Sequence, residues 1–266
     1  MSVNFQLKDR YTMDDLLEIM QLLRSPEGCP WDREQTHQSI RSNLLEETHE
    51  ALEAINNNDT DGLLEELGDV LLQIVFHAQM EEENDSFNFG DVVDSICQKL
   101  VIRHPHVFGD VTVSDTGQVL KNWDAIKRAT KGGKSQADLL QGLPRSLPAL
   151  MRAGKVQSRA RRVGFDWPDV SGAIEALDSE IAELKEAMAD GDQSQIHQEL
   201  GDVLFSVVNV SRFLKVDAEQ ALTDSSDKFI RRFTSVEQLA KEQNIDMSST
   251  SLEQLDKLWD QAKSRE

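Results

Sequence analysis

The sequence has few of the residues on which disulfide-linked and membrane-embedded proteins depend. Two cysteines occur, Cys29 and Cys97, too few for a recognisable disulfide framework, so we expect a reducing, cytoplasmic environment. The longest apolar runs, such as 70–72 and 74–76, fall far short of the roughly 20 residues that cross a bilayer. Residues 1–10 lack the apolar stretch of a secretory signal. We therefore expect no membrane partner.

The chain is also poor in basic residues. It has 28 lysine and arginine residues against 48 aspartate and glutamate residues, so its formal net charge at pH 7 is −20. This excess of negative charge repels nucleic acid polymers and anionic membranes, and we expect neither as a partner. A phosphorylated small molecule can still bind where a metal ion and a local basic cluster offset its charge.

Proline, glycine and tyrosine are scarce as well, with 6, 14 and 1 residues. Glu, Leu, Ala and Gln dominate the periodic segments, and no segment alternates with period two, which predicts an all-α protein. Thr12, Thr36 and Thr60 are expected helix caps, and Ser251 with Gln254 forms a predicted capping box. The expected helices cover about 12–24, 36–56, 60–83, 89–102, part of 113–130, 147–161, 171–190, 193–214, 218–243 and 251–259, with a loop at 29–32.

Two acidic pairs stand in the first half of the chain. Glu47 and Glu50 are three residues apart, as are Glu66 and Asp69, so each pair shares one face of a helix. The segment between the pairs contains the turn signal 56–59, which predicts two antiparallel helices whose carboxylates face each other. Four converging carboxylates repel one another unless a cation lies among them, and oxygen ligands suit Mg²⁺ or Mn²⁺.

The same four acids recur 133 positions later as Glu180, Glu183, Glu199 and Asp202. This repeat predicts two domains in tandem. We assign an N-terminal module to 1–130, a linker to the Gly- and Lys-containing stretch 131–146, and a C-terminal module to 147–266.

The setting of the acids favours a metal site over an ordinary solvated helix face. Asp69 lies among Leu67, Val70 and Leu71, and acids on the apolar side of a helix need a partner or a metal. The glycine beside each acid, Gly68 in the first module and Gly201 in the second, predicts a close approach of another backbone or a ligand.

Basic and aromatic residues are repeated too, each pair four residues apart. They predict phosphate contacts from Arg and Lys, whereas the tryptophans are expected mainly as core anchors, with base stacking as a second role. The pairs are Lys99 with Arg103, Lys228 with Arg232, Trp123 with Lys127, and Trp259 with Lys263.

The two acidic motifs resemble those of the MazG nucleotide pyrophosphohydrolase family, a Glu-x-x-Glu followed by a Glu-x-x-Asp. The segments 29–32, 104–108, 144–148 and 163–167 look like those of its long, two-module bacterial form. The resemblance implies a helical bundle related to the all-α dUTPases and NTP pyrophosphatases, usually dimeric. It also implies Mg²⁺-dependent hydrolysis of nucleoside triphosphates to monophosphate and pyrophosphate.

Two other functions stay open at this point. Glu46-x-x-His49 fits a di-iron carboxylate bundle, although the second repeat has no histidine at its acidic pairs. The alternative is a nucleotide-sensing module without catalysis.

Both acidic quartets are intact, so the choice of catalytic module must come from the surrounding charges. The second module has more basic residues near its acids, including Arg162 and Lys228, and we expect it to hold the main activity. The competing interpretation is that these arginines pair with surface acids.

Overall fold

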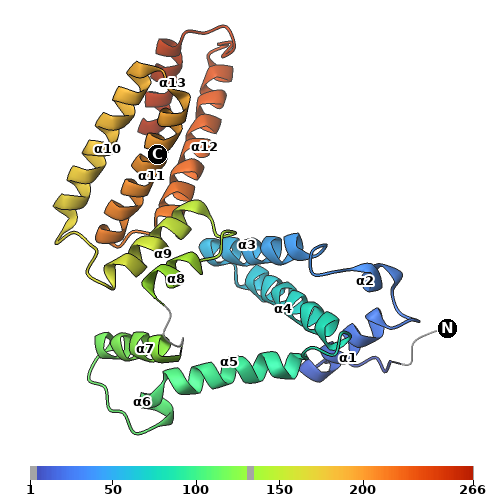
Figure 1. The fold of residues 1–266 in the computed structure, drawn as a ribbon. Helices are drawn as coiled ribbons and strands as arrows, with labels where there is room; N and C mark the ends of the chain where they lie inside the picture. Colours follow the sequence, from blue (N-terminus) through green and yellow to red (C-terminus); the bar gives the residue numbers. More distant parts are fainter. Residues whose placement is uncertain (1–4, 131–134, 266) are drawn as a thin grey trace. The chain divides into compact units, whose positions relative to one another are not determined.

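The computed structural model describes residues 5–130 and 135–265, and every regular element in these ranges is a helix (Figure 1). The chain divides into two compact units, Met1–Gly132 and Gly133–Glu266. In the stretch 131–146, expected as a linker, Ser135 caps a short helix, α8 (Gln136–Gln141), which packs against α9 of the second unit.

Unit 1 is organised around an antiparallel helix pair, α3 and α4. Asn58 ends α3 in the left-handed conformation, and the Asp59 side chain accepts from the Gly62 amide to cap α4. Helix α1 packs on α4, which also contacts α5. The elements are α1 (Met13–Arg24), α2 (Pro30–Glu34), α3 (Arg41–Asn57), α4 (Thr60–Glu82), α5 (Phe89–Arg103), α6 (Pro105–Phe108) and α7 (Thr116–Thr130).

The helix starts in unit 1 differ in part from those expected. Thr12 caps α1 through a complete capping box with Asp15, as predicted. Asp59 rather than Thr60 caps α4, because an aspartate one position earlier reaches the same free amides. Helix α3 begins later than expected, with Ile40 as its N-cap. The segment expected as a loop at 29–32 contains the start of α2, with a proline in its first turn.

The core of unit 1 lies between α1, the start of α3 and the second half of α4. Its most buried members are Met20, Ile40, Val75, Phe76 and Met80. The paired acids Glu66 and Asp69 lie in the first half of α4, so the core fixes the other end of the helix while the end with these two acids stays closer to the surface.

Two side chains, His37 and Arg24, fasten the segment before α3 to α4. The His37 ring lies 2.7 Å from the His77 ring through their Nδ1 atoms, and its Nε2 lies 2.7 Å from Glu81 Oε1. Burial, and next the neighbouring His37, lower the pKa of His77. Arg24 donates to both oxygens of Glu83 at 2.7 Å and to the carbonyl of Asp32. These bonds hold the chain that leads into the acid-bearing helix α3.

Unit 2 repeats the antiparallel pair with α10 and α11. Gly191 takes the left-handed conformation that ends α10, and the Asp192 side chain caps α11. Figure 1 shows α10, α11, α12 and α13 running alongside one another, with α9 across one end. The elements are α9 (Ala149–Arg161), α10 (Val170–Asp190), α11 (Gln193–Leu214), α12 (Ala218–Glu242) and α13 (Leu252–Ser264).

The most tightly packed apolar cluster of unit 2 joins α12 to α13 through Val236, Leu239, Ala240, Leu258 and Ala262. The capping box predicted for α13 does not form: Ser251 is the N-cap, but its side chain makes no capping bond. The backbone amide of the third residue of the helix bonds to the Ser251 carbonyl instead, at 3.0 Å. Among the described residues, no helix combines the length and hydropathy needed to cross a bilayer.

The packing of α13 generates a stability prediction. Leu258 is 2% exposed and Leu252, on the same helix, is 74% exposed. Leu258→Ala should lower the free energy of unfolding by about 2–5 kcal/mol, because a buried leucine leaves a cavity. Leu252→Ala should change it by about 0.5 kcal/mol or less. Urea denaturation followed by circular dichroism measures both, and equal effects of the two substitutions would contradict the packing described.

Candidate functional site

In unit 1, the helix pair brings three of the four predicted acids into one cluster. One carboxylate oxygen each of Glu47, Glu66 and Asp69 lies within 4.8 Å of the others, and all three residues are half-buried. Glu47 comes from α3 and the other two from α4. Glu50, the fourth predicted acid, lies one turn further along α3 and is exposed.

Unit 2 builds the same cluster from α10 and α11. Oxygens of Glu180, Glu199 and Asp202 lie within 4.8 Å of one another, with the first two half-buried and Asp202 exposed. Glu183 is again the exposed fourth acid, and its carboxylate accepts from the Ser179 hydroxyl at 3.1 Å. The repeat in sequence is therefore a repeat in geometry.

The clustered carboxylates disfavour one another's charge. Burial raises the pKa of Glu47, Glu66 and Glu180, and the neighbouring carboxylates of each cluster raise it further. No basic side chain is among the causes of these shifts. The protein itself therefore supplies little compensation for the negative charge gathered in either cluster.

One carboxylate oxygen in the cluster of unit 1 is left without a hydrogen-bond partner in the described structure. Oε2 of Glu66 is buried and has no hydrogen-bond partner in the described part of the chain. A buried carboxylate oxygen without a partner is unfavourable. A divalent cation bound among the carboxylates would satisfy it, and an all-oxygen set fits Mg²⁺ or Mn²⁺.

The histidine considered for an iron site does not join the cluster. Glu46 and His49 are both exposed, and neither belongs to the acidic groups found among the described residues. The di-iron interpretation requires a histidine ligand, and neither acid cluster includes one among the described residues.

The glycines beside the acids do not have the close neighbour that we expected. Apart from the two neighbouring residues and the backbone of the adjacent helical turns, no atom of the described chain lies within 4 Å of a Cβ built on Gly68 or on Gly201. Both positions are exposed, so no other part of the described chain makes the close approach, and the approach of a ligand stays a prediction. The surface beside each acid cluster is open instead.

The repeated basic and aromatic residues come together in pairs. The guanidinium of Arg103 lies 5.1 Å from the centre of the Trp123 ring, and that of Arg232 lies 6.0 Å from the Trp259 ring. Trp259 also packs against Phe229, with ring centres 5.1 Å apart. Each unit therefore has an arginine on an indole face, a favourable cation–π arrangement.

The remaining predicted basic residues are more scattered. Lys99 and Lys228 are exposed. Lys263 lies 3.4 Å from Asp260, and Arg162 forms the C-cap of α9. The side chain of Lys127 lies outside the described residues.

Part of the basic group ahead of the second acid cluster is already engaged. Arg159 donates to the carbonyl of Leu139, and Arg161 lies 3.6 Å from Asp166. The second contact is the arginine–acid pairing that the competing interpretation of the sequence anticipated.

Sequence reasoning missed a pocket of about 490 Å³ in unit 2. It lies between α9, the loop after it and the second half of α11, and its lining includes Gln157, Trp167 and Asn209. The loop 164–167 stood out in the sequence as an echo of the first module, but nothing there indicated that an amide from α9 would face it.

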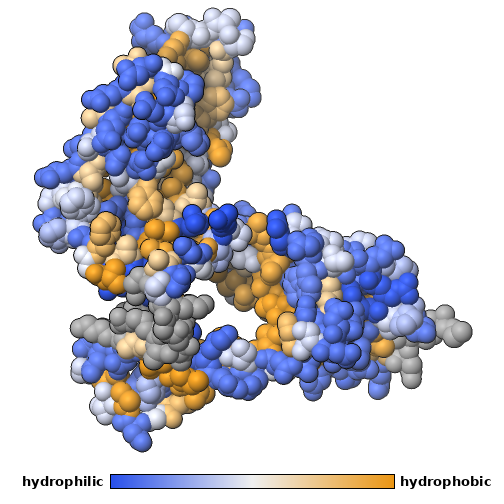
Figure 2. All heavy atoms as spheres, viewed as in Figure 1, coloured by the Kyte–Doolittle hydropathy of each residue, from blue (hydrophilic) through white to orange (hydrophobic). Residues whose placement is uncertain are grey.

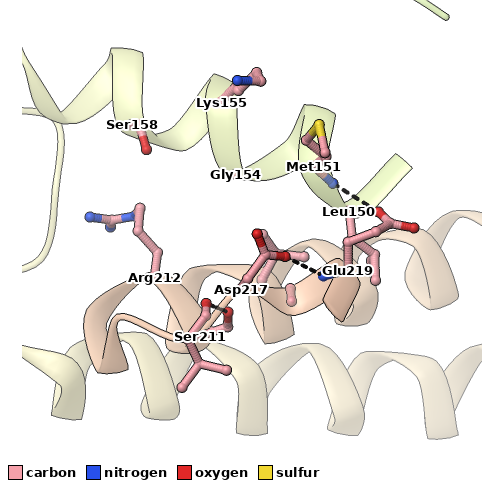
Figure 3. A pocket seen from close by; sticks show the side chains of 12 residues that line it. Leu150, Met151, Gly154, Lys155, Ser158, Ser211, Arg212, Asp217 and Glu219 are labelled. Atoms are coloured by element: carbon pink, nitrogen blue, oxygen red, sulfur yellow. Dashed lines mark hydrogen bonds between the residues drawn. The ribbon is translucent and has the colours of Figure 1, made fainter. Parts of the chain in front are cut away.

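A smaller pocket, of about 240 Å³, lies between α9, the end of α11 and the start of α12 (Figure 3). Its acids serve the protein's own backbone: Glu219 accepts from the Met151 amide at 3.1 Å, and Asp217 caps α12. Lys155 and Arg212 also line it. These bonds join α9 to α12, and we assign this pocket a structural role.

The structure thus defines a class: an all-α protein with two modules, each holding a cluster of three carboxylates on an antiparallel helix pair. The MazG nucleotide pyrophosphohydrolase domain matches the chain twice, at residues 35–108 and 170–237. These ranges contain the two acid clusters. The chain belongs to this family.

Similar proteins span nearly its whole length. The nucleoside triphosphate pyrophosphohydrolase/pyrophosphatase MazG of Thermotoga maritima is 45% identical over 250 residues, 94% of this chain and 95% of that protein. The nucleoside triphosphate pyrophosphohydrolase of Escherichia coli K12 is 45% identical over 259 residues, 96% of this chain and 98% of that protein. The uncharacterized protein YabN of Bacillus subtilis is 48% identical over 249 residues, 93% of this chain but 51% of that protein.

The two clusters generate a prediction about metal binding. Mn²⁺ titrated into the metal-free chain should bind at both, and it should raise the melting temperature because it binds the folded state. Glu66→Gln should weaken binding at the first cluster about tenfold or more, and Glu199→Gln should do so at the second, since each loses a charged ligand.

Electron paramagnetic resonance of free Mn²⁺ measures both affinities. Glu82→Gln is a suitable control, because Glu82 ends α4 far along the helix from the cluster and is exposed. Unchanged Mn²⁺ affinity in both cluster variants would show that these acids are not ligands.

Proposed function

We propose that this chain is a Mg²⁺-dependent nucleoside triphosphate pyrophosphohydrolase that forms a nucleoside monophosphate and pyrophosphate. The observation that carries the proposal is the three-carboxylate cluster, built twice, with the partnerless Glu66 oxygen inside it. Such a cluster suits a cation that also binds a triphosphate. The names of the relatives from Thermotoga maritima and Escherichia coli support the same activity.

The acids on the paired helices would hold Mg²⁺, with Mn²⁺ as a substitute. When bound, the cation supplies charge neutralisation for triphosphate oxygens and acidification of a water molecule. In unit 2 the holding residues are Glu180, Glu199 and Asp202, and Glu183 completes the set from the next turn of α10.

The chain's other residues have separate proposed tasks. Glu180 or Glu183 orients the attacking water and accepts its proton. Lys228 and Arg232 offset charge on the departing pyrophosphate. Trp259 and Lys263 complete the substrate site, and Lys99, Arg103, Trp123 and Lys127 are their counterparts in unit 1.

We propose further that the C-terminal module has the main activity. A triphosphate adds negative charge to a chain whose net charge is already −20, so basic residues near the acids must compensate. Unit 2 has Lys155, Arg162 and Lys228 in addition to the Arg232–Trp259 pair. In unit 1, Lys8 pairs with Asp15 and Arg24 with Glu83.

Paired substitutions test this assignment. Glu180→Gln with Glu183→Gln should lower pyrophosphate release from nucleoside triphosphates by orders of magnitude, because ligands of the catalytic cation are lost. Glu47→Gln with Glu50→Gln should leave most of the activity. The assay uses the eight common triphosphates with Mg²⁺, and with EDTA as the metal-free control.

The reverse result would assign catalysis to unit 1. Activity that persists in EDTA would contradict the metal requirement. Tight triphosphate binding without pyrophosphate release by the unmodified chain would show a nucleotide sensor instead of an enzyme.

We also propose a cytoplasmic homodimer that binds neither nucleic acid polymers nor membranes. Apolar side chains next to the acid clusters are exposed, among them Leu67 and Ile74 on α4 and Leu204 and Val207 on α11. Figure 2 shows such hydrophobic surface on both units. Val75, the residue after Ile74, is buried in the core instead, at 1% exposed.

Sedimentation velocity at micromolar concentration tests the assembly. A dimer of the 30.0 kDa chain is expected, because contiguous exposed apolar surface is stabilised when a second copy covers it. Leu204→Glu should weaken the dimer by placing a charge in the interface, whereas Leu252→Glu, on exposed surface elsewhere, should not. A monomer at these concentrations would refute the proposal.

A further inference from the structure

The 490 Å³ pocket of unit 2 has the size and lining of a small-molecule site. Apolar and aromatic side chains form most of its wall, including Val156, Phe165, Trp167 and Phe205. Polar side chains of α9 and α11 also line it. It is separate from the acid cluster, because none of its lining residues is one of the clustered acids.

The orientation of the Gln157 amide is dictated by its surroundings. Its Nε2 donates to the carbonyl of Phe205 at 2.8 Å, and a carbonyl can only accept, so the nitrogen must face that way. Oε1 is then the other atom, and it is buried without a hydrogen-bond partner in the described structure. Gln157 is only 7% exposed, so it gives the pocket wall a buried acceptor in need of a donor.

The Asn209 amide is oriented in the same way. Arg212 donates to its Oδ1 at 2.6 Å, and because a guanidinium only donates, the oxygen must face the arginine. The Nδ2 donor is then directed away from that bond. Arg212 is itself fixed by two bonds to Asp166, at 2.9 and 2.5 Å, which tie the loop 164–167 to α11.

The position of the pocket along α11 relates it to the acid cluster. Asp202 and Asn209 are seven residues apart, close to two helical turns, so they share one face about 10 Å from each other along the axis. A ribose with its α-phosphate can span such a gap. A triphosphate held at the acids of unit 2 would therefore reach the pocket with its base.

Exposed aromatic side chains that line the pocket offer the stacking surface that a base requires. Phe165 is 82% exposed and Trp167 is 48% exposed, although both are large and apolar. Aromatic rings offer stacking surface for any base, worth about 1–3 kcal/mol per base in single-stranded nucleic acid complexes. Their exposure beside an amide-lined pocket is explained if a flat ligand covers them.

From this geometry we infer that the pocket of Gln157, Trp167 and Asn209 binds the base of the nucleoside triphosphate. Gln157 Oε1 accepts from an N–H of the base, and Asn209 Nδ2 donates to an adjacent acceptor on the same edge. Bases with an N–H donor on that edge are selected over those without one, since the latter leave the buried acceptor unpaired. The inference deepens the proposed function and rests on it.

The test compares ATP with purine riboside triphosphate, which lacks the exocyclic N–H group. It uses the full chain with Glu47→Gln and Glu50→Gln, so that only the acids of unit 2 act. Here kcat/KM should be about tenfold or more higher for ATP. Gln157→Met should reduce that ratio toward one by lowering the value for ATP alone.

Two further variants keep the inference falsifiable if Gln157→Met fails to fold. Phe165→Ala changes an exposed side chain and should raise KM for both nucleotides by loss of stacking, with kcat little changed. Phe87→Ala, an exposed phenylalanine of unit 1, should change neither. Quenching of tryptophan fluorescence by adenosine gives a readout that needs no catalysis, and Trp167→Phe should remove it.

The outcomes separate the two proposals. If the unmodified chain releases no pyrophosphate, the proposed function fails, whatever adenosine does. If it is active but the ratio for the two nucleotides is unchanged by Gln157→Met, and KM is unchanged by Phe165→Ala, the pocket does not bind the base.

Discussion

Mutual repulsion among the clustered carboxylates is the constraint on which the rest of this molecule depends. Antiparallel helices place three acids within 4.8 Å in each unit, and burial with like charge raises the pKa of Glu47, Glu66 and Glu180. A fold that holds such a cluster must fasten its helices elsewhere. Unit 1 does so with the apolar core at the far end of α4 and with the bonds of Arg24 and His37.

Each unit holds its clustered carboxylates on an antiparallel helix pair of the same kind, but the elements around the pair differ between the units. Aspartates cap the second helix of each pair, and left-handed residues end the first, so the acids have the same register in both. Behind the acids of unit 2, however, α9 and the loop 164–167 enclose a pocket with two oriented amides. A carboxylate cluster in each unit, together with the pocket lined by Gln157 and Asn209 in unit 2, is the basis for the division of labour that we propose between the modules.

The arginines of the second module show what can and cannot be inferred from the number of charges in a sequence. In the sequence, the basic residues of the second module stand both ahead of its acids and after them. In the structure they have different tasks: Arg161 pairs with Asp166, Arg159 bonds to a backbone carbonyl, and Arg232 lies over Trp259. Arg212, which did not stand out in the sequence, orients Asn209 and fastens the loop. Number and sign of charge are legible in a sequence, whereas the partner of each charge depends on folding.

The sequence by itself determined the all-α class, the repeat and the acids, because helical periodicity and spacing three apart are local properties. It also predicted the long helices to within about five residues at each end, although it missed the short helices α2, α6 and α8. Only the tertiary structure decided which acids of each quartet are left exposed, that Val75 lies in the core, and that Gln157 and Asn209 line one pocket. These features depend on how helices distant in sequence pack against one another. Local spacing determines the face of a helix on which a side chain lies, but the packing of the helices determines which residues that side chain contacts.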